Sequence, residues 1–292
     1  MTETAAVTAR GLKKIFNRQS VLDLLDLTIE HGEAVGLLGA NGAGKTTLLK
    51  SLLGLLPVDG GRCTVLGESS SSLSSGVRRR LAYVPQSPGQ FPWLTGLSML
   101  RYVSSFYPSF DWVYAQDLAA RWKLALATQI GVLSPGQQQR LSIVRALATR
   151  PELLVLDEPI ASLDPATRIA VIDELLSERK RRVITVIFSS HIIGDLERLC
   201  SRLAVLAAGK IAVMESVDWF RSRVRVTLDG EESALEQTSI PGVALVRKVG
   251  SGRRIAVVER DGVARLVASL PSEIQLKTDE MDVEALTSEW MQ

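Results

Sequence analysis

The segment that best indicates the fold of this chain is Gly39-Ala40-Asn41-Gly42-Ala43-Gly44-Lys45-Thr46, followed by Thr47. It fits the pattern G-x-x-x-x-G-K-[ST], in which a glycine-rich loop wraps around phosphate groups. Glycines let the backbone approach closely, so successive N–H groups can point at phosphate oxygens. Lys45 can reach the β- and γ-phosphates, and the Thr46 hydroxyl can bind magnesium. We therefore predict that residues 39–47 bind the triphosphate of ATP together with Mg²⁺.

The residues on either side of this loop favour the same interpretation over an accidental glycine-rich turn. Ala34–Leu38 is a short apolar run, typical of a buried parallel strand. Thr46–Leu53 has the composition of a helix, with Gly54 suited to its C-terminal cap and Pro57 just beyond. A helix that begins beside the loop adds its partial positive charge to an anion site.

Apolar strands and helices alternate along the rest of the first 217 residues. Such alternation predicts an α/β fold with a mostly parallel sheet covered on both faces. Strands are expected within Val7–Ile29 and at Leu81–Val84, Leu153–Leu156, Val183–Phe188 and Leu203–Ala207, and helices at Pro165–Arg179 and Ile192–Cys200. Glu68–Gly76 is serine-rich and is interpreted as a surface loop. Between Pro88 and Ile130, prolines and aromatic residues followed by helical spacing predict a helical insertion.

The sequence pattern changes again at about Val217. Apolar residues alternate with polar ones over 224–228, and short helices fit Val263–Leu270 and Val283–Trp290. We therefore expect a large domain over residues 1–217 and a small α+β domain over residues 218–292.

Composition excludes several classes of protein. The chain has 292 residues, of which 46% are hydrophobic, and this is enough apolar material for a packed core. The formal net charge is only +2, so a nucleic-acid partner is not expected. The two cysteines form no CxxC pair, so a cysteine-based zinc site is not expected, and so few cysteines fit a reducing, cytosolic compartment. No apolar run approaches the ~18 residues of a membrane span, so other chains would have to cross any membrane at which this protein works.

Two carboxylates follow directly after an apolar strand. Asp157-Glu158 ends the run Leu153–Leu156, and ligands bind at the carboxyl ends of strands in such sheets. One carboxylate there can hold magnesium, and its neighbour can orient or deprotonate a water that attacks the γ-phosphate. An ordinary acidic turn is the alternative, but the phosphate loop in the same sheet favours the catalytic interpretation.

Three further polar segments are candidates for the site only because of where they lie relative to the predicted strands and helices. Gln86 and His191 each come shortly after a predicted strand, although a lone histidine is more often structural. Ser134-Pro135-Gly136-Gln137 precedes a helical run. Since serine caps helices well and proline suits the first turn, this segment alone indicates a well-made helix start.

Taken together and in this order, the motifs resemble the nucleotide-binding subunit of an ABC transporter over about Ala6 to Val217. Residues 39–46 resemble the Walker A loop, Gln86 the Q-loop glutamine, and Ser134–Gln137 the signature motif. Asp157 and Glu158 resemble the Walker B aspartate and the catalytic glutamate. Ser162-Leu163-Asp164 resembles the D-loop, and His191 the switch histidine.

This resemblance implies a P-loop fold of the ABC type, with a mostly parallel core sheet, an N-terminal antiparallel β subdomain and a helical subdomain at about residues 87–140. It implies catalytic roles for Glu158, His191 and Gln86, and magnesium contacts for Thr46, Gln86 and Asp157. Phe16 falls where the family places an aromatic ring on adenine, although a core phenylalanine is the alternative. The implied nucleotide contacts are Phe16, Gly39, Asn41, Gly42, Ala43, Gly44, Lys45, Thr46, Thr47, Ser134, Gly136 and Gln137.

The resemblance also implies partners. Two cassettes pack head to tail in this family, so Ser134 and the Gly136 N–H would contact the γ-phosphate held by the other cassette. Pro135 departs from the usual LSGGQ sequence and has no N–H, but the serine and Gly136 remain. The region of residues 83–95 resembles cassettes that serve ABC-2-type permeases, often exporters. The implied location is the cytoplasmic face of the cell membrane, on separate permease subunits.

Two rival functions differ in class. One is an ABC-type ATPase acting on DNA or the ribosome. A single signature motif and the lack of a long heptad run argue against it. The other is a regulatory module with an inactive site, and the presence of Lys45, Asp157, Glu158 and His191 argues against that.

Overall fold

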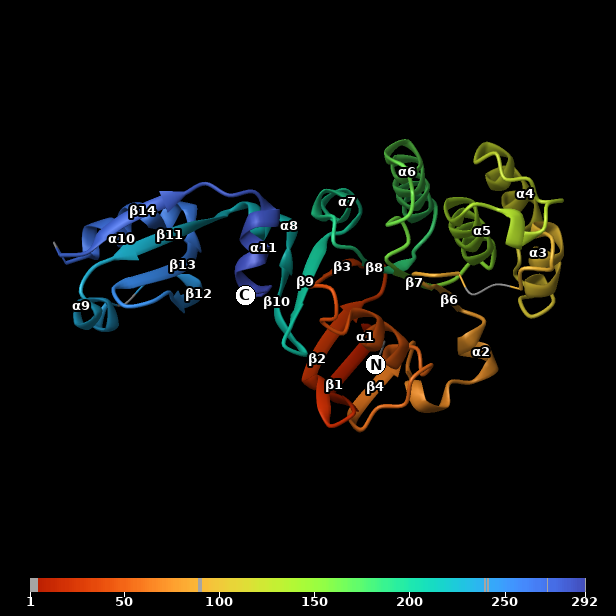
Figure 1. Ribbon diagram of the computed structural model, residues 1–292. Helices are drawn as coiled ribbons and strands as arrows, with labels where there is room; N and C mark the ends of the chain where they lie inside the picture. Colours follow the sequence, from red (N-terminus) through yellow and green to blue (C-terminus); the bar gives the residue numbers. More distant parts are fainter. Residues whose placement is uncertain (1–4, 89–90, 239, 241, 272, 292) are drawn as a thin grey trace. The chain divides into compact units, whose positions relative to one another are not determined.

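The computed structural model describes residues 5–88, 91–238, 240, 242–271 and 273–291 (Figure 1). The chain divides into two compact units, one ending at Ala212 and the other beginning at Val213. Each unit is described here by itself. The sequence-based boundary at 217 falls on the first residue of helix α8 (Val217–Arg221), and the assignment of domains on either side of it stays a prediction.

A six-stranded sheet of order β10-β9-β3-β8-β7-β6 forms the centre of the first unit. Its strands are β3 (Ala34–Leu38), β6 (Leu81–Val84), β7 (Leu153–Asp157), β8 (Thr185–Ser189), β9 (Arg202–Ala207) and β10 (Lys210–Ser216). The pairs from β9 through β6 are parallel. Every residue of β3, β7 and β8 is buried, as apolar strands covered on both faces must be. The predicted α/β architecture is confirmed.

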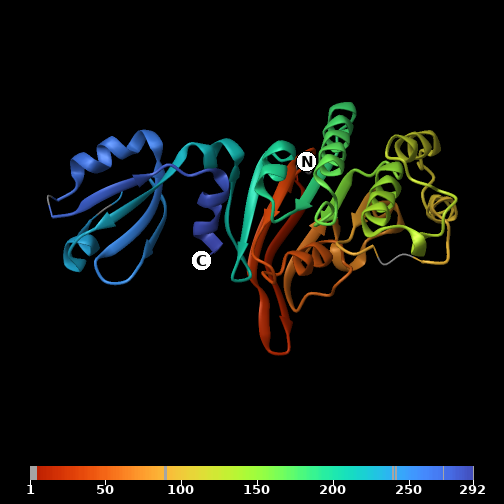
Figure 2. The ribbon, with the colours of Figure 1, turned by 45° about the horizontal axis from the view of Figure 1, so that its top comes forward.

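Helices cover both faces of this sheet. The helices α5 (Pro135–Ala148), α6 (Pro165–Arg181) and α7 (Ile193–Leu199) lie on one side, and α1 (Lys45–Leu52) lies on the other with the red β1–β2 hairpin (Figures 1 and 2). The carboxyl ends of β3, β7 and β8 all open toward the same edge, because these strands are parallel and in register. The residues that follow them therefore meet there.

A second, antiparallel sheet has the order β2-β1-β4-β5. Its strands are β1 (Ala5–Phe16), β2 (Gln19–Glu30), β4 (Gly60–Val65) and β5 (Glu68–Ser69). The prediction that Glu68–Gly76 is a loop is wrong, since this segment forms β5, a 3₁₀ helix at Ser70–Ser72 and the start of α2 (Ser75–Arg78). The Ser74 Oγ accepts a hydrogen bond from the Val77 N–H, so serine acts here as a helix cap.

The predicted helical insertion is confirmed for the residues that are described; Gly89 and Gln90 lie outside them. It contains α3 (Gly96–Ser104), α4 (Trp112–Arg121) and a 3₁₀ helix at Ile130–Val132, and leads into α5. Thr95 caps α3 and Asp111 caps α4, each through its side-chain oxygen. None of the described helices is long and apolar enough to cross a membrane.

The second unit is built on an antiparallel sheet of order β12-β13-β11-β14. Its strands are β11 (Arg223–Asp229), β12 (Val243–Lys248), β13 (Arg253–Glu259) and β14 (Gln275–Asp279), and its helices are α8, α9 (Glu232–Gln237), α10 (Val263–Ser269) and α11 (Val283–Met291). Leu235 of α9 and Leu266 of α10 pack on one face, against Val224, Val226 and Leu228. The predicted α10 and α11 are present. The short α8 and α9 were not predicted.

A buried carboxylate supports the opposite face of this small sheet. Glu289 of α11 is 3% exposed and forms ion pairs with Arg225 at 3.0 Å and Arg247 at 2.8 Å. Arg225 also pairs with Asp279 on the neighbouring strand. Because the two guanidinium groups come from β11 and β12, Glu289 joins α11 to two strands that are not adjacent in the sheet.

We predict that Glu289→Ala lowers the free energy of unfolding of this unit by about 3 kcal/mol, because it leaves two arginines without their shared carboxylate. Urea unfolding followed by tryptophan fluorescence measures the change. The control is Glu280→Ala, which removes the exposed partner of Arg260 and should cost less than about 1 kcal/mol. Equal losses in the two variants would contradict the structural role of Glu289.

Candidate nucleotide-binding site

The glycine-rich loop joins the end of β3 to the start of α1. Gly42 and Gly44 have φ values of +83° and +99°, which L side chains rarely adopt. A Cβ on Gly39 would lie 2.7 Å from the Leu206 carbonyl oxygen, and one on Gly44 would lie 3.0 Å from Val21. Glycine is therefore favoured at Gly42 by the backbone conformation, at Gly39 by space, and at Gly44 by both. Helix α1 begins at Lys45, so its N-terminus faces the loop.

A hollow of about 320 Å³ opens over this loop. Gln86, beyond β6, and Glu158, beyond β7, line it together with the loop and Val21 of β2. The loop residues that line it are Ala40, Asn41, Gly42, Gly44, Lys45, Thr46 and Thr47. Gly39 and Ala43 belong to the loop but are not part of this lining. The structure thus brings Gln86 and Glu158 to the phosphate loop, as the sequence analysis expected.

Lys45 is buried, with 7% of its side chain exposed. Its ammonium donates to the carbonyl oxygens of Gly39 at 2.7 Å and Ala40 at 3.3 Å, and it lies 3.4 Å from Glu158 Oε1. A buried ammonium requires anionic or carbonyl partners. The charge of Lys45 is therefore held at the mouth of the loop, where it can bind phosphate oxygens.

Asp157 and Glu158 are tied together by the hydroxyl of Ser189. This hydroxyl donates to Asp157 Oδ1 at 3.0 Å and accepts from the Glu158 N–H at 2.9 Å. The contact exists because β7 and β8 run in parallel with Asp157 opposite Ser189. Sequence analysis did not assign Ser189 a role. A polar residue that closes an otherwise apolar strand was the only signal for it.

Glu158 has an unusual backbone conformation, with a φ of +47°. Such a conformation is costly for a residue other than glycine and needs support from its surroundings. The Ser189 hydroxyl supplies that support at the backbone. At the side chain, Glu158 Oε2 lies 2.9 Å from the Nδ1 atom of His191, whose ring is half exposed. His191 and Lys45 therefore hold Glu158 from two sides.

The other oxygen of Asp157 accepts a hydrogen bond from the Tyr83 hydroxyl at 3.2 Å. Burial raises the pKa of Tyr83, and the nearby charge of Asp157 raises it further. The hydroxyl therefore keeps its proton and remains a donor. The sequence places Tyr83 in a strand and at the start of the region that resembles cassettes for ABC-2-type permeases, but it predicts no contact with Asp157. Its role depends on the pairing of β6 with β7, which the sequence does not state.

The residues expected to bind magnesium offer suitable chemistry. Asp157 is fully buried, and in the described part of the chain no lysine or arginine forms an ion pair with it. Its contacts with the Ser189 and Tyr83 hydroxyl groups leave the carboxylate without a cationic side-chain partner, as a cation site requires. Thr46 and Gln86, which line the hollow, add oxygen atoms of the kind that Mg²⁺ prefers.

The signature segment does not line the hollow of its own chain. Ser134 is exposed and caps α5, where its Oγ accepts from the Gln137 N–H at 3.3 Å and its N–H donates to Gln137 Oε1 at 2.9 Å. Pro135 occupies the first turn of the helix. Next to it, a Cβ on Gly136 would lie 3.4 Å from Leu163. The helix-start interpretation is thus correct as a description of local structure.

Phe16 lies at the end of β1 and is 43% exposed, so the alternative of a core phenylalanine is wrong. The Lys14 ammonium lies 5.2 Å from the centre of its ring. Phe16 is not part of the lining of the hollow.

Comparisons with known proteins agree with this geometry. The family model described as "ABC transporter" matches residues 22–161. The Nod factor export ATP-binding protein I of Rhizobium sp. (strain N33) is 37% identical over 214 residues, which are 70% of this chain and 69% of that protein. An uncharacterized ABC transporter ATP-binding protein of Synechocystis sp. is 37% identical over 64% of this chain and 54% of its own length. A solved structure described as an ATP binding subunit of an ABC transporter has a TM-score of 0.68 at 26% identity, covering 74% of this chain and 92% of its own.

The glycine-rich loop between a buried strand and a helix, with two carboxylates beside it, defines a P-loop nucleotide-binding protein. The matches refine this class: the chain belongs to the ATP-binding proteins of ABC transporters, and it contains their ATPase domain. The predicted family and fold class are confirmed. The chain spans about half the length of the Synechocystis relative.

We predict that Ser189→Ala disturbs both carboxylates at once, because it leaves the buried Glu158 N–H and Asp157 Oδ1 without their shared partner. The free energy of unfolding should fall by about 1–3 kcal/mol, as for other buried groups left unsatisfied. Thermal unfolding measures this loss. Ser201→Ala is the control, since Ser201 donates only to a backbone carbonyl at the opposite end of β3. ATP turnover should fall only for Ser189→Ala, and unchanged turnover there would contradict the role assigned to Ser189.

Proposed function

We propose that this chain binds ATP with Mg²⁺ in the hollow over the phosphate loop and hydrolyses it to drive a separate membrane permease. The observation that carries the proposal is the position of Glu158. Its carboxylate lines the hollow, contacts both His191 and Lys45, and is 7% exposed. A carboxylate so placed beside a phosphate loop is suited to polarise a water for attack on the γ-phosphate.

The chain's own residues divide the work between binding and catalysis. The loop N–H groups, the N-terminus of α1 and the Lys45 ammonium bind the phosphates. Phosphate oxygens compete with Glu158 for Lys45, which leaves the Glu158 carboxylate free to face water. His191 holds the other oxygen of that carboxylate. Asp157, Thr46 and Gln86 would hold Mg²⁺, which would supply positive charge against the negative charge that develops on the phosphates.

A second cassette completes each ATP site in this proposal. Ser134 is exposed, and neither it nor Gly136 nor Gln137 lines the hollow of its own chain. These residues begin the 14-residue helix α5, whose N-terminus is suited to an anion. Head-to-tail packing would bring Ser134, Gly136 and Gln137 to the γ-phosphate of the ATP bound by the partner cassette. Phe16 would stack on the adenine of the ATP that is bound by its own phosphate loop. Whether the two cassettes are identical does not affect this geometry.

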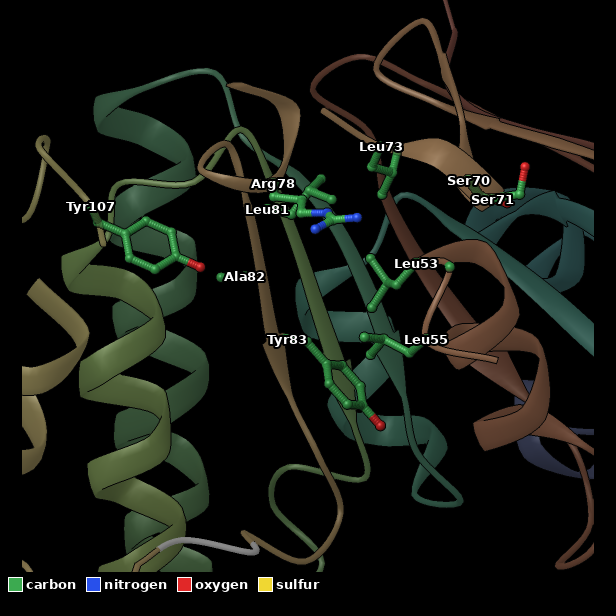
Figure 3. A pocket seen from close by; sticks show the side chains of 11 residues that line it. Leu53, Leu55, Ser70, Ser71, Leu73, Arg78, Leu81, Ala82, Tyr83 and Tyr107 are labelled. Atoms are coloured by element: carbon green, nitrogen blue, oxygen red, sulfur yellow. The ribbon is translucent and has the colours of Figure 1, made fainter. Parts of the chain in front are cut away.

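A groove in the first unit supports a permease as the further partner (Figure 3). It encloses about 440 Å³, and its wall combines leucine and tyrosine side chains with Arg78. Tyr107 lines the groove, and Phe106 is its neighbour in the sequence. Phe106 belongs to a group of four exposed aromatic residues whose rings are in contact. These are Phe91, Trp93, Tyr102 and Phe106, with ring centres 5.3–5.9 Å apart. Exposed apolar surface of this kind favours a protein partner, here an apolar cytoplasmic segment of the permease.

The relatives suggest the direction of transport. The similarity to a Nod factor export protein extends over 70% of this chain. We propose that this chain likewise serves an exporter of the ABC-2 type. It would be bound to the cytoplasmic face of the membrane through the permease. In this proposal residues 1–217 form the cassette and residues 218–292 an accessory domain.

We predict that Glu158→Gln retains ATP binding and loses most hydrolysis, because the amide cannot accept the proton of the attacking water. Phosphate release measures turnover, and a fluorescent ATP analogue measures binding. Glu152→Gln changes the same residue type just before β7 and should leave turnover unchanged, since Glu152 pairs only with the exposed Arg80. Near-normal turnover by Glu158→Gln would remove Glu158 from the role of base.

We also predict that Trp93→Ser reduces the amount of a multi-span membrane protein that co-purifies with this chain from membranes. Trp93 is 67% exposed, so its loss costs little stability but removes apolar contact area. Val113→Ser is the control, because Val113 is 80% exposed on α4 of the same helical subdomain and is not one of the four aromatic residues. A purely soluble complex in the wild type would contradict the transporter function itself.

A further inference from the structure

Tyr83 occupies a position that connects the groove with the metal-binding carboxylate. It lies in β6, the edge strand of the core sheet, opposite Val155 of β7. Asp157 is two residues beyond Val155, and residues two apart on a strand point to the same face. The long side chain of Tyr83 therefore runs along this face and reaches the carboxylate at the strand end, where its hydroxyl donates at 3.2 Å.

The same side chain forms part of the groove wall. Tyr83 is half-buried, whereas the other three residues of β6 are buried, and it lines the groove together with Leu53 and Leu55 (Figure 3). It also lines a neighbouring hollow of about 290 Å³ with Phe106 and Tyr107. One end of Tyr83 is thus in contact with the catalytic site, and its ring is accessible from the groove.

Asp157 is held by two hydroxyl groups of different kinds. Ser189 is fully buried in the core sheet, and its position is fixed by the pairing of β7 with β8. Tyr83 comes from an edge strand and is partly open to a groove. A molecule that enters the groove can therefore shift the Tyr83 hydroxyl while the Ser189 hydroxyl stays in place.

We propose that Tyr83 is a positioning residue for the ATPase reaction: its hydroxyl holds Asp157 in the orientation that Mg²⁺ requires, and its ring makes that hydrogen bond sensitive to the occupant of the groove. The proposal rests on the function proposed above. Residues that orient a metal-binding group typically change metal affinity by about 10- to 100-fold when they are removed.

The first test uses the full chain and the variant Tyr83→Phe, which removes only the hydroxyl. Affinity for a fluorescent, non-hydrolysable ATP analogue is measured with Mn²⁺ and again with EDTA, and the ratio reports what the metal contributes. We expect Tyr83→Phe to lower this ratio about 10-fold and to leave the affinity in EDTA unchanged. The width of the Mn²⁺ resonance in the analogue complex should change as well.

Tyr114→Phe is the matched control. The Tyr114 hydroxyl also donates to a buried carboxylate, that of Glu174 at 2.9 Å, but in the helical subdomain. Both variants should lose thermal stability, and only Tyr83→Phe should change the ratio. A ratio within twofold of the wild type for Tyr83→Phe would overturn the assignment of Tyr83 alone. A wild-type chain that bound no analogue under either condition would overturn the ATPase proposal.

The second test addresses the groove. Leu55 is 60% exposed on the groove wall, whereas Cys63 and Cys200 are buried, so Leu55→Cys offers one accessible thiol for a bulky maleimide. We expect the label to lower the metal-dependent ratio at least threefold when Tyr83 is present and to have no effect in Tyr83→Phe. The control label on Val113→Cys should change neither protein. Equal effects of the Leu55→Cys label with and without the hydroxyl would overturn the link through Tyr83.

Discussion

The structure around the site in the first unit depends on one constraint: the carboxylate of Asp157, buried at the end of an apolar strand, needs hydrogen-bond partners. Asp157 has no exposed surface, and an unpaired charge in such a place would be prohibitively costly. Two hydroxyl groups solve the problem, one from the strand on each side of β7. Both donors are hydroxyl groups, so no cationic side chain takes the place of a bound cation. The two contacts link β6, β7 and β8 and place the carboxylate at the common edge of these strands.

That requirement explains how much of the site the sequence could predict. The phosphate loop, Asp157, Glu158, Gln86 and His191 follow predicted strands, and parallel strands end at one edge, so their meeting could be foreseen. Ser189 and Tyr83 could not be identified in this way. Each acts across a strand pair, and a single sequence contains no information on which residue lies opposite which. The same limit applies to Phe16, whose exposure depends on where the β1–β2 hairpin ends.

The errors in the predicted fold have a related cause. Glu68–Gly76 is rich in serine, a composition that predicts a loop. In the structure Ser74 caps α2, and Glu68 accepts hydrogen bonds from both the N–H and the hydroxyl of Ser74. Serine favours helix starts as well as turns, so composition alone could not separate the two. Helices α8 and α9 are only five and six residues long, too short for a helical period to be recognised.

The arrangement of Lys45, Glu158 and His191 shows why the site needs the fold around it. Glu158 adopts a left-handed backbone conformation, in which its N–H donates to the Ser189 hydroxyl and its carbonyl accepts from the Ala161 N–H. In return, this conformation turns the carboxylate away from the axis of β7 and toward the loop, where Lys45 and His191 contact it. A serine in the core thus contacts the backbone of Glu158, the residue proposed to be catalytic, while an edge tyrosine contacts the carboxylate of its neighbour Asp157. The two carboxylates share the Ser189 hydroxyl as a partner, and Asp157 alone of the pair also contacts Tyr83 on the edge strand. In the proposal made here, a change at the groove therefore reaches the cation site through Asp157.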